Sequence, residues 1–326
     1  DELTATIYDN PELMKLINEH QIEVNPKDML GVRVGIINRE GTALILKFKE
    51  HMPELAKLMP WADRYHQSVS DGEELKQTMV DVDLVALTGD YAQCRGAITT
   101  AQNLPNNDKL SIKTGGGHRN AYHRQVRKSV DVERNRKLLE KLVAPELHRY
   151  FDLEADHLFV IGHENGHSLG PDNEYQRALG LHRSTIEEEK ADTVSIAFMP
   201  EYVKAGVIDG ETLKKIYTTW VVYRLFLKAQ PLEAHRVGEL IHFNFLHDNG
   251  AFYFDENNKL HINFDRFHEV VFAMLKETIE VQLSKSSEKA KAFIDKYTNW
   301  GKHSQYIAEV QKELGVKNYI VIKDYF

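Results

Sequence analysis

The chain has 326 residues, of which 42% are hydrophobic and 28% charged, and it carries a formal net charge of −8. This length is sufficient for a sizeable core, in two ordinary domains or one two-lobed unit. The negative charge argues against a general nucleic-acid-binding protein, and no apolar run approaches the length of a membrane span.

The single cysteine, Cys94, excludes an intramolecular disulfide framework and does not identify the compartment. A cytoplasmic location is favoured. A periplasmic or secreted location would follow if a signal segment ahead of Asp1 had been removed. Composition makes no prediction about the oligomeric state.

Residues 1–130 predict a smaller lobe of mixed helices and strands. Strands are indicated by β-branched runs bounded by turn residues, and helices by apolar residues at helical spacing. The predicted elements are a helix over 11–20, strands over 31–38 and 42–48 around a turn at 38–41, a helix over 51–59 stopped by Pro60, and a strand over 81–88.

Residues 101–120 are rich in turn-forming residues, so their composition favours a solvent-exposed loop. Asparagine amides in such a loop, including Asn103 and Asn106, can also anchor an extended ligand. The triple glycine at 115–117 lacks the flanking pattern of a phosphate-binding loop, so we do not predict a nucleotide site there.

Residues 131–326 predict a mainly helical lobe. Apolar residues recur there at helical spacing, and proline and glycine mark several ends. The predicted elements are helices over 133–147, 156–169, 185–199, 210–228, 231–246, 264–283, 287–300 and 303–314, a hairpin over 252–254 and 260–264, and a strand over 319–322.

The segment from His163 to His167 reads His-Glu-Asn-Gly-His. Two histidines four residues apart on a helix lie on one face, where both imidazoles can bind one Zn²⁺ ion. Glu164 follows the first histidine and can take a proton from metal-bound water. The pattern alone also occurs by chance, so a third ligand is needed to support a catalytic site.

A second helical run supplies that ligand about twenty residues later. A zinc hydrolase needs three protein ligands and one open position for water, and Glu188 is the predicted third ligand. Asp192 lies one turn further on the same face and can hold the free ring nitrogen of a ligand histidine. The spacing does not indicate which of the two histidines it holds. Glu-x-x-x-Asp at this distance is the arrangement of thermolysin-like zinc peptidases.

His235 lies in the first turns of a later predicted helix. A lone helical histidine is more often structural than catalytic. Histidine can nevertheless donate a hydrogen bond to the oxyanion that forms when water attacks a carbonyl group. The remaining histidines have no spacing that predicts a second metal site.

These segments resemble the dipeptidyl peptidase III family of zinc peptidases. That family has one more residue inside its first motif, His-Glu-x-x-Gly-His, than the segment at 163–167. Its second motif resembles residues 187–192, and the resemblance assigns zinc binding to Glu188. Residues 300–306 are also similar to the family's C-terminal region.

The resemblance also implies substrate-binding roles. The segment 103–108 is similar to the family's Asn-x-Pro-Asn-Tyr-Asp, which implies that Asn103 and Asn106 hold the substrate backbone and free amine. Ala-His at 234–235 resembles a helix start whose histidine stabilises the transition state. Residues 22–26 are a degenerate counterpart of another segment, with Glu23 as amine anchor. Glu239 stands where the family has an arginine, so anchoring of the peptide C-terminus is expected to differ.

The expected fold is α+β, with a mostly helical zinc lobe, a smaller mixed lobe and an active-site cleft between them. The expected function is a zinc metallopeptidase with one Zn²⁺ per chain, releasing dipeptides from the free N-termini of short peptides. Two alternatives stay open. One is hydrolysis of a non-peptide ester, lactone or amide, and the other is a catalytically silent zinc-dependent binding protein. We expect neither nucleic acid nor membrane as a partner.

Overall fold

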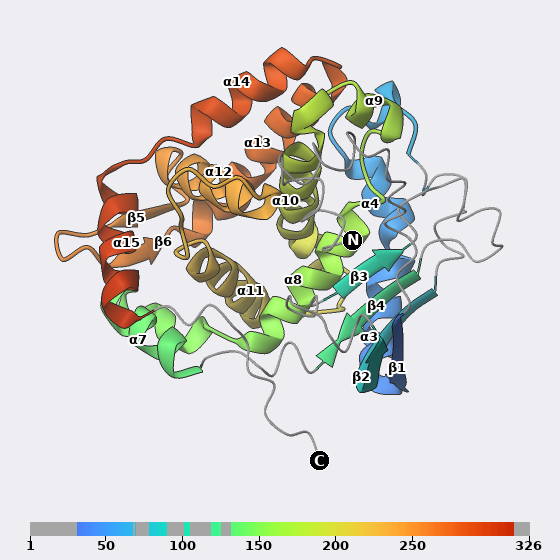
Figure 1. Cartoon of the computed structure of the whole chain (residues 1–326), viewed down its shortest axis with the longest axis horizontal. Helices are drawn as coiled ribbons and strands as arrows, with labels where there is room; N and C mark the ends of the chain where they lie inside the picture. The colour runs from blue at the N-terminus through green and yellow to red at the C-terminus, as the bar shows by residue number, and fades with distance from the viewer. Residues whose placement is uncertain are drawn as a thin grey trace, which may run out of the picture.

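The computed structural model describes residues 31–67, 69, 78–89, 101–104, 119–124 and 132–315 (Figure 1). Most of these residues are helical, and the strands form two small sheets. The fold is therefore mostly helical α+β, as the sequence predicts. The predicted helix at 11–20 and strand at 319–322 lie outside the described residues. The boundary at residue 130 and the cleft between two lobes stay predictions.

A four-stranded sheet lies at one side of the molecule (Figure 1). Its strands, in the order β1-β2-β4-β3, are Gly31–Asn38 (β1), Thr78–Gly89 (β2), Arg119–His123 (β4) and Ala101–Leu104 (β3). β2 pairs antiparallel with β1 and parallel with β4, and β3 pairs antiparallel with β4.

The strands β1 and β2 were predicted, whereas β3 and β4 were not. The prediction of a loop over 101–120 is wrong at both ends, where β3 and the start of β4 lie. β3 and β4 pair with each other, and β4 also pairs with β2. These backbone hydrogen bonds come from distant segments, which local turn composition cannot reveal.

The predicted strand at 42–48 is wrong, because this segment belongs to helix α3, Arg39–Glu50. The side chain of Asn38 accepts a hydrogen bond of 2.8 Å from the backbone N–H of Gly41, as a helix N-cap does. Ile45 and Phe48, three residues apart, are fully buried. The apparent hairpin turn is therefore a helix start, and α3 packs on β2. The predicted helix at 51–59 is confirmed as α4, Met52–Leu58.

The remaining helices surround a continuous apolar core (Figure 1). All but the short helix over Asn173–Arg177, which was not predicted, confirm the predicted helices, most with shifts at their ends. They are Val132–Leu142 (α7), Leu153–Gly166 (α8), Asn173–Arg177 (α9), Arg183–Lys204 (α10), Gly210–Tyr223 (α11), Ala234–Asp248 (α12), Phe264–Leu283 (α13), Ser287–Tyr297 (α14) and Lys302–Leu314 (α15). The predicted hairpin is also confirmed, as Phe252–Phe254 (β5) and Leu260–Ile262 (β6).

Two boundary differences have clear local causes. The helix expected from 231 begins at Ala234. The carboxylate of Glu233 caps it there, because it accepts hydrogen bonds from the backbone N–H groups of His235 and Arg236. The helix expected over 133–147 ends at Leu142, and a 3₁₀ segment over Pro145–Tyr150 follows. Proline suits the first turn of a helical segment, because it has no backbone N–H and none is needed at that position.

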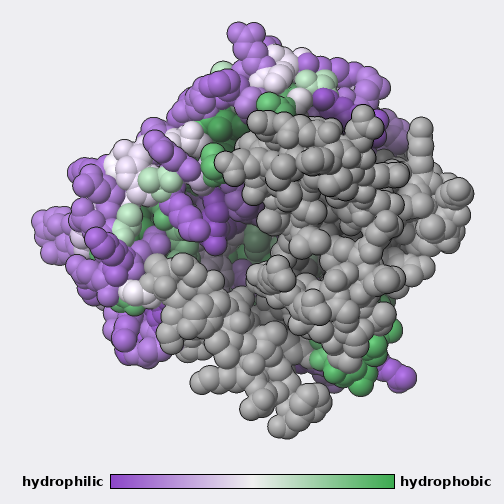
Figure 2. Space-filling model, in the orientation of Figure 1, coloured by the Kyte–Doolittle hydropathy of each residue, from purple (hydrophilic) through white to green (hydrophobic). Residues whose placement is uncertain are grey.

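Apolar side chains are also exposed on the outer strands of the sheet. Val34, Ile36 and Ile37 on β1 are 46%, 63% and 55% exposed. In Figure 2 a green area appears where Figure 1 draws β1 and β2. Within the described ranges, no helix is long and apolar enough to cross a membrane.

Candidate metal centre

Helix α8 presents two histidines on one face at its C-terminal end. His163 lies in its last turn and His167 is its C-cap residue. Their spacing of four residues brings the two Nε2 atoms to 3.1 Å from each other. Asp152 caps the other end of the helix, where its side chain accepts a hydrogen bond from the N–H of Glu154. The rings therefore lie as the sequence motif predicts.

Helix α10 brings a carboxylate to the same point. Oε2 of Glu188 lies 3.4 Å from Nε2 of His163 and 3.7 Å from Nε2 of His167. Two glycines of α8 make this approach possible. A Cβ added at Gly166 would lie 2.7 Å from the backbone oxygen of Ala191, so a larger residue there would push the helices apart. A Cβ at Gly162 would contact only side-chain atoms of α10.

The hydrogen bonds of the two imidazole rings indicate which nitrogen of each ring carries a proton and which offers a lone pair. Nδ1 of His163 lies 2.6 Å from Oδ1 of Asp192, and Nδ1 of His167 lies 3.1 Å from Oε1 of Glu187. In the neutral form of each ring, the Nδ1–H donates to a carboxylate, which leaves Nε2 as an acceptor. Two acceptors at 3.1 Å from each other repel unless a cation lies beside both. Asp192, expected to hold one of the two histidines, lies against His163.

The carboxylate of Glu188 also presents an unpaired acceptor atom to this centre. Its Oε2 atom is buried and accepts no hydrogen bond. Donors bound at about 2.0–2.1 Å to a tetrahedral Zn²⁺ ion lie roughly 3.3–3.4 Å apart. The three separations of 3.1, 3.4 and 3.7 Å lie on either side of that value. His163, His167 and Glu188 can thus hold a small divalent ion together.

Electrostatics favour positive charge at the centre of this cluster. Burial lowers the pKa of His163, but the neighbouring carboxylates of Asp192 and Glu188 outweigh it and raise that pKa well above its usual value. Burial raises the pKa of Glu188, but the neighbouring histidines outweigh it and lower that pKa to about 2. The carboxylates therefore stay ionised and attract a cation to the Nε2 atoms.

The two predicted catalytic residues lie on α8 and on α12. Glu164 is buried on α8, three residues before His167 and so on an adjoining part of the same helix face. His235 begins α12, and its Nδ1 lies 3.5 Å from Oε2 of Glu188. Its side chain is 56% exposed, so one edge of the ring is open to an incoming molecule. The fold thus brings a segment 47 residues beyond Glu188 to the metal ligands.

Three residues of this centre were missed by the sequence reasoning. Glu187 holds His167, Arg224 donates to Asp192 at 2.9 Å, and Lys190 forms an ion pair of 2.8 Å with Glu187. Glu187 could have been identified from its position one residue before a ligand. Arg224 could not, because it lies at the C-terminal end of another helix, α11, and belongs to no local sequence pattern.

The predicted substrate-binding residues are less completely described. Asn103 belongs to β3, where its backbone pairs with Asn120 of β4. Asn106 and Glu23 lie outside the described residues. Glu239, one turn after His235, accepts a bidentate ion pair from Arg236 at 2.8 and 2.9 Å. The substrate roles of these residues stay predictions.

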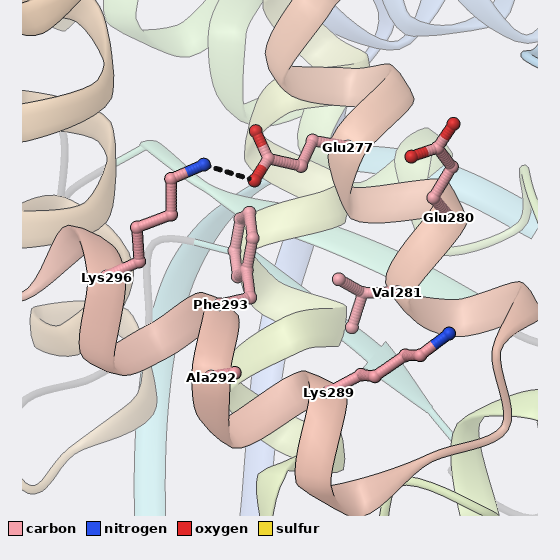
Figure 3. Close-up of a pocket in the computed structure, with 7 residues that line it drawn as sticks. All are labelled: Glu277, Glu280, Val281, Lys289, Ala292, Phe293 and Lys296. Carbon is pink, nitrogen blue, oxygen red and sulfur yellow. Dashed lines mark hydrogen bonds and ion pairs between the residues drawn. The ribbon is translucent and has the colours of Figure 1, made fainter.

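A surface pocket lies elsewhere, between α13 and α14 (Figure 3). It has a volume of about 310 Å³ and is lined by seven residues. Figure 3 shows Lys296 of α14 reaching Glu277 of α13, an ion pair of 2.9 Å. The residues that line it include none of the metal cluster, so this hollow is separate from the candidate centre.

Comparison with known proteins relates the fold to solved structures. Dipeptidyl peptidase III from Caldithrix abyssi superimposes with a TM-score of 0.74 at 23% identity, over 87% of this chain and 58% of that one. The enzyme of the same name from Corallococcus sp. strain EGB gives 0.75 at 19% identity, over 88% and 54%. The chain therefore has a dipeptidyl peptidase III-like fold and spans little more than half of each of these two structures.

Sequence comparison gives a more distant relation. Nudix hydrolase 3 of Arabidopsis thaliana is 22% identical over 275 residues, which are 81% of this chain and 34% of that protein. No protein-family model matches the chain. The chain thus spans about a third of this curated relative, and at this identity the relative's name does not define the activity of the chain.

Proposed function

We propose that the chain is a zinc-dependent peptidase that releases dipeptides from the free N-termini of short peptides. The observation that carries the proposal is the donor set of His163, His167 and Glu188. Two imidazole nitrogens and a carboxylate oxygen converge there, all within 4.8 Å of one another. The similarity to two dipeptidyl peptidase III structures supports the substrate class.

Zn²⁺, when bound, lowers the pKa of water and polarises a carbonyl group. In the proposed mechanism the carboxylate of Glu164 takes the proton of the attacking water and passes it to the leaving amine. Burial of Glu164 limits competition by bulk water for that proton. Asp192 and Glu187 keep the Nδ1 protons of the two histidines in place, so both Nε2 atoms stay available as ligands.

His235 has the second chemical role in the proposal. Its ring lies within reach of Glu188 and is partly exposed, so an N–H of the ring can donate to the carbonyl oxygen as negative charge develops. Asn103, Asn106 and Glu23 are proposed to hold the peptide backbone and its free amine. Glu239 offers no positive charge to a peptide carboxylate, and its own carboxylate accepts from Arg236 at 2.8 and 2.9 Å.

A hydrolysis screen tests this function. Purified protein, zinc-loaded or treated with a chelator, is incubated with di- to hexapeptides whose N-termini are free or acetylated. We expect dipeptides to be released only from free N-termini and only by the zinc-loaded protein. Mass spectrometry of the products identifies the bond that is cleaved.

The same screen separates the alternatives. Hydrolysis of ester, lactone or amide substrates without cleavage of any peptide would replace the peptidase proposal with a non-peptide hydrolase. Zinc binding without hydrolysis of any substrate would favour a binding protein. Glu164 argues against the latter, because a site that only binds zinc has no need of a buried base beside its ligands.

A further inference from the structure

Each candidate ligand histidine is held by a carboxylate that is in turn held by a buried cation. On the His163 side, Asp192 accepts from the ring through Oδ1 and from Arg224 through Oδ2, at 2.6 and 2.9 Å. The side chain of Arg224 is 6% exposed. Its guanidinium carbon lies 4.7 Å from the ring centre of Trp220 and 5.5 Å from that of Phe159. The aromatic rings thus fix the plane of the guanidinium group.

On the His167 side the cation is Lys190, which is fully buried. Its ammonium group pairs with Oε1 of Glu187 at 2.8 Å, the same oxygen that accepts from His167. It also donates to the backbone oxygens of Gly166 and Leu169, each at 2.7 Å. Lys190 therefore holds both the carboxylate and the backbone around the last turn of α8.

We propose that Arg224 and Lys190 are positioning residues that act on the metal ligands through Asp192 and Glu187. The inference rests on the proposed function only in taking His163 and His167 as zinc ligands. A carboxylate can rotate and offer either oxygen to a ring. A cation bound to it removes that freedom, so the Nδ1–H bond keeps one direction and Nε2 points at the ion.

The planar shape of the guanidinium group distinguishes a positioning role of Arg224 from simple helix packing. A planar guanidinium between two aromatic rings has a fixed orientation that a lysine at the same place would lack. A second ion pair of α11, which joins it to α8 rather than to α10, serves as the comparison. Lys215 of α11 pairs with Asp152, the N-cap of α8, also at 2.9 Å, but Asp152 touches no ligand histidine. Removing Lys215 therefore removes a helix-to-helix pair without disturbing the metal centre.

The test compares Arg224→Met, Arg224→Lys and Lys215→Met with the wild type. Zinc affinity is measured by competition with a chromophoric chelator, and ligand geometry by the visible absorption of the Co²⁺-substituted protein. Thermal unfolding of the metal-free protein reports the structural contribution alone. None of these readouts uses a peptide. If the wild type proved to have no peptidase activity, this test of the positioning role would still be valid.

We expect Arg224→Met to weaken zinc binding by about 10- to 100-fold and to alter the Co²⁺ spectrum. Arg224→Lys should recover part of the affinity, because the charge returns without the planar fork. Lys215→Met should stay within about threefold of the wild-type zinc affinity. A folded Arg224→Met protein with wild-type affinity and spectrum would overturn the role of Arg224. If this variant does not fold, Arg224→Gln, which keeps a donor and much of the volume, takes its place with the same criteria.

Lys190 is tested through its partner, because removing a fully buried lysine that binds backbone oxygens risks unfolding α8. Glu187→Gln keeps an acceptor for His167 and loses the charge that pairs with Lys190. We expect zinc affinity to fall by about tenfold, with a changed Co²⁺ spectrum. Unchanged affinity and spectrum in this variant would overturn the second half of the proposal.

Discussion

The metal cluster and the pocket between α13 and α14 both combine carboxylates and cations from neighbouring helices, yet their charges are arranged differently. In the pocket, Glu277 pairs directly with Lys296 at 2.9 Å and accepts a hydrogen bond of 2.8 Å from the hydroxyl of Tyr297. In the cluster, the cations bind Glu187 and Asp192 instead. The oxygen of Glu188 that faces the histidines is left without a hydrogen bond.

This difference indicates at which of the two places a ligand would gain the most binding free energy. The pocket has a volume of about 310 Å³, but its Glu277 and Lys296 are already paired with each other. An exposed ion pair contributes about 0–1 kcal/mol and attracts little else. The cluster holds three acceptor atoms that only a cation can satisfy together. Unsatisfied polar atoms therefore locate the candidate site better than the volume of a hollow does.

The largest expected effect comes from removing the ligand on α10. Glu188→Ala should weaken zinc binding at least about 100-fold, because it removes a ligand rather than a residue that orients one. Turnover should be lost with the metal. Zinc content after gel filtration and chelator competition measure the affinity. Wild-type zinc affinity in this variant would show that the cluster is not the metal site.

Removing the proposed base should separate chemistry from metal binding. Glu164→Gln keeps the shape of the side chain and all three candidate ligands, so zinc affinity should change little. Turnover should fall by about 10²- to 10⁴-fold, the usual contribution of a general base. Steady-state hydrolysis at full zinc occupancy gives kcat. A kcat equal to that of the wild type would exclude Glu164 as the base.

A smaller effect is expected from separating the two metal-binding helices. Gly166→Ala would place a Cβ 2.7 Å from the backbone oxygen of Ala191, which costs about 1–3 kcal/mol and moves Glu188 away from the histidines. Gly238→Ala on α12 is the control, since the nearest atom to its Cβ would be Cε1 of His242 at 3.9 Å, an ordinary contact. Urea unfolding and zinc affinity should both rank Gly166→Ala as the more damaging change. Equal effects of the two substitutions would contradict the close backbone approach as the cause.

The smallest effect is expected in the pocket. Glu277→Gln removes its ion pair with Lys296, whose side chain is 57% exposed, so the free energy of unfolding should fall by less than about 1 kcal/mol. Zinc affinity and peptide hydrolysis should not change. Urea unfolding and the hydrolysis assay check both statements. A large loss of hydrolysis would move the functional site to the pocket and reverse the comparison.

Much of the helical part follows from local patterns. The helix predicted at 264–283 has the bounds of α13, and the motif at 163–167 lies on α8 with its two histidines on one face. Both depend on periodic spacing along a single helix, which the chain carries in its own order. The same reasoning failed at 42–48, where a run of apolar residues after a turn suited a strand. The Asn38 cap and burial against β2 stabilise α3 there instead.

The sequence by itself determined which residue types could bind a metal, since His163, His167 and Glu188 stand at spacings that need no other segment to be recognised. Only the tertiary structure decided that Asp192 holds His163 rather than His167, and that Arg224 supports it from the end of α11. The physical reason is distance along the chain. A spacing of four residues is set by the helix itself, whereas the contact between residues 192 and 224 exists only because α8, α10 and α11 pack together.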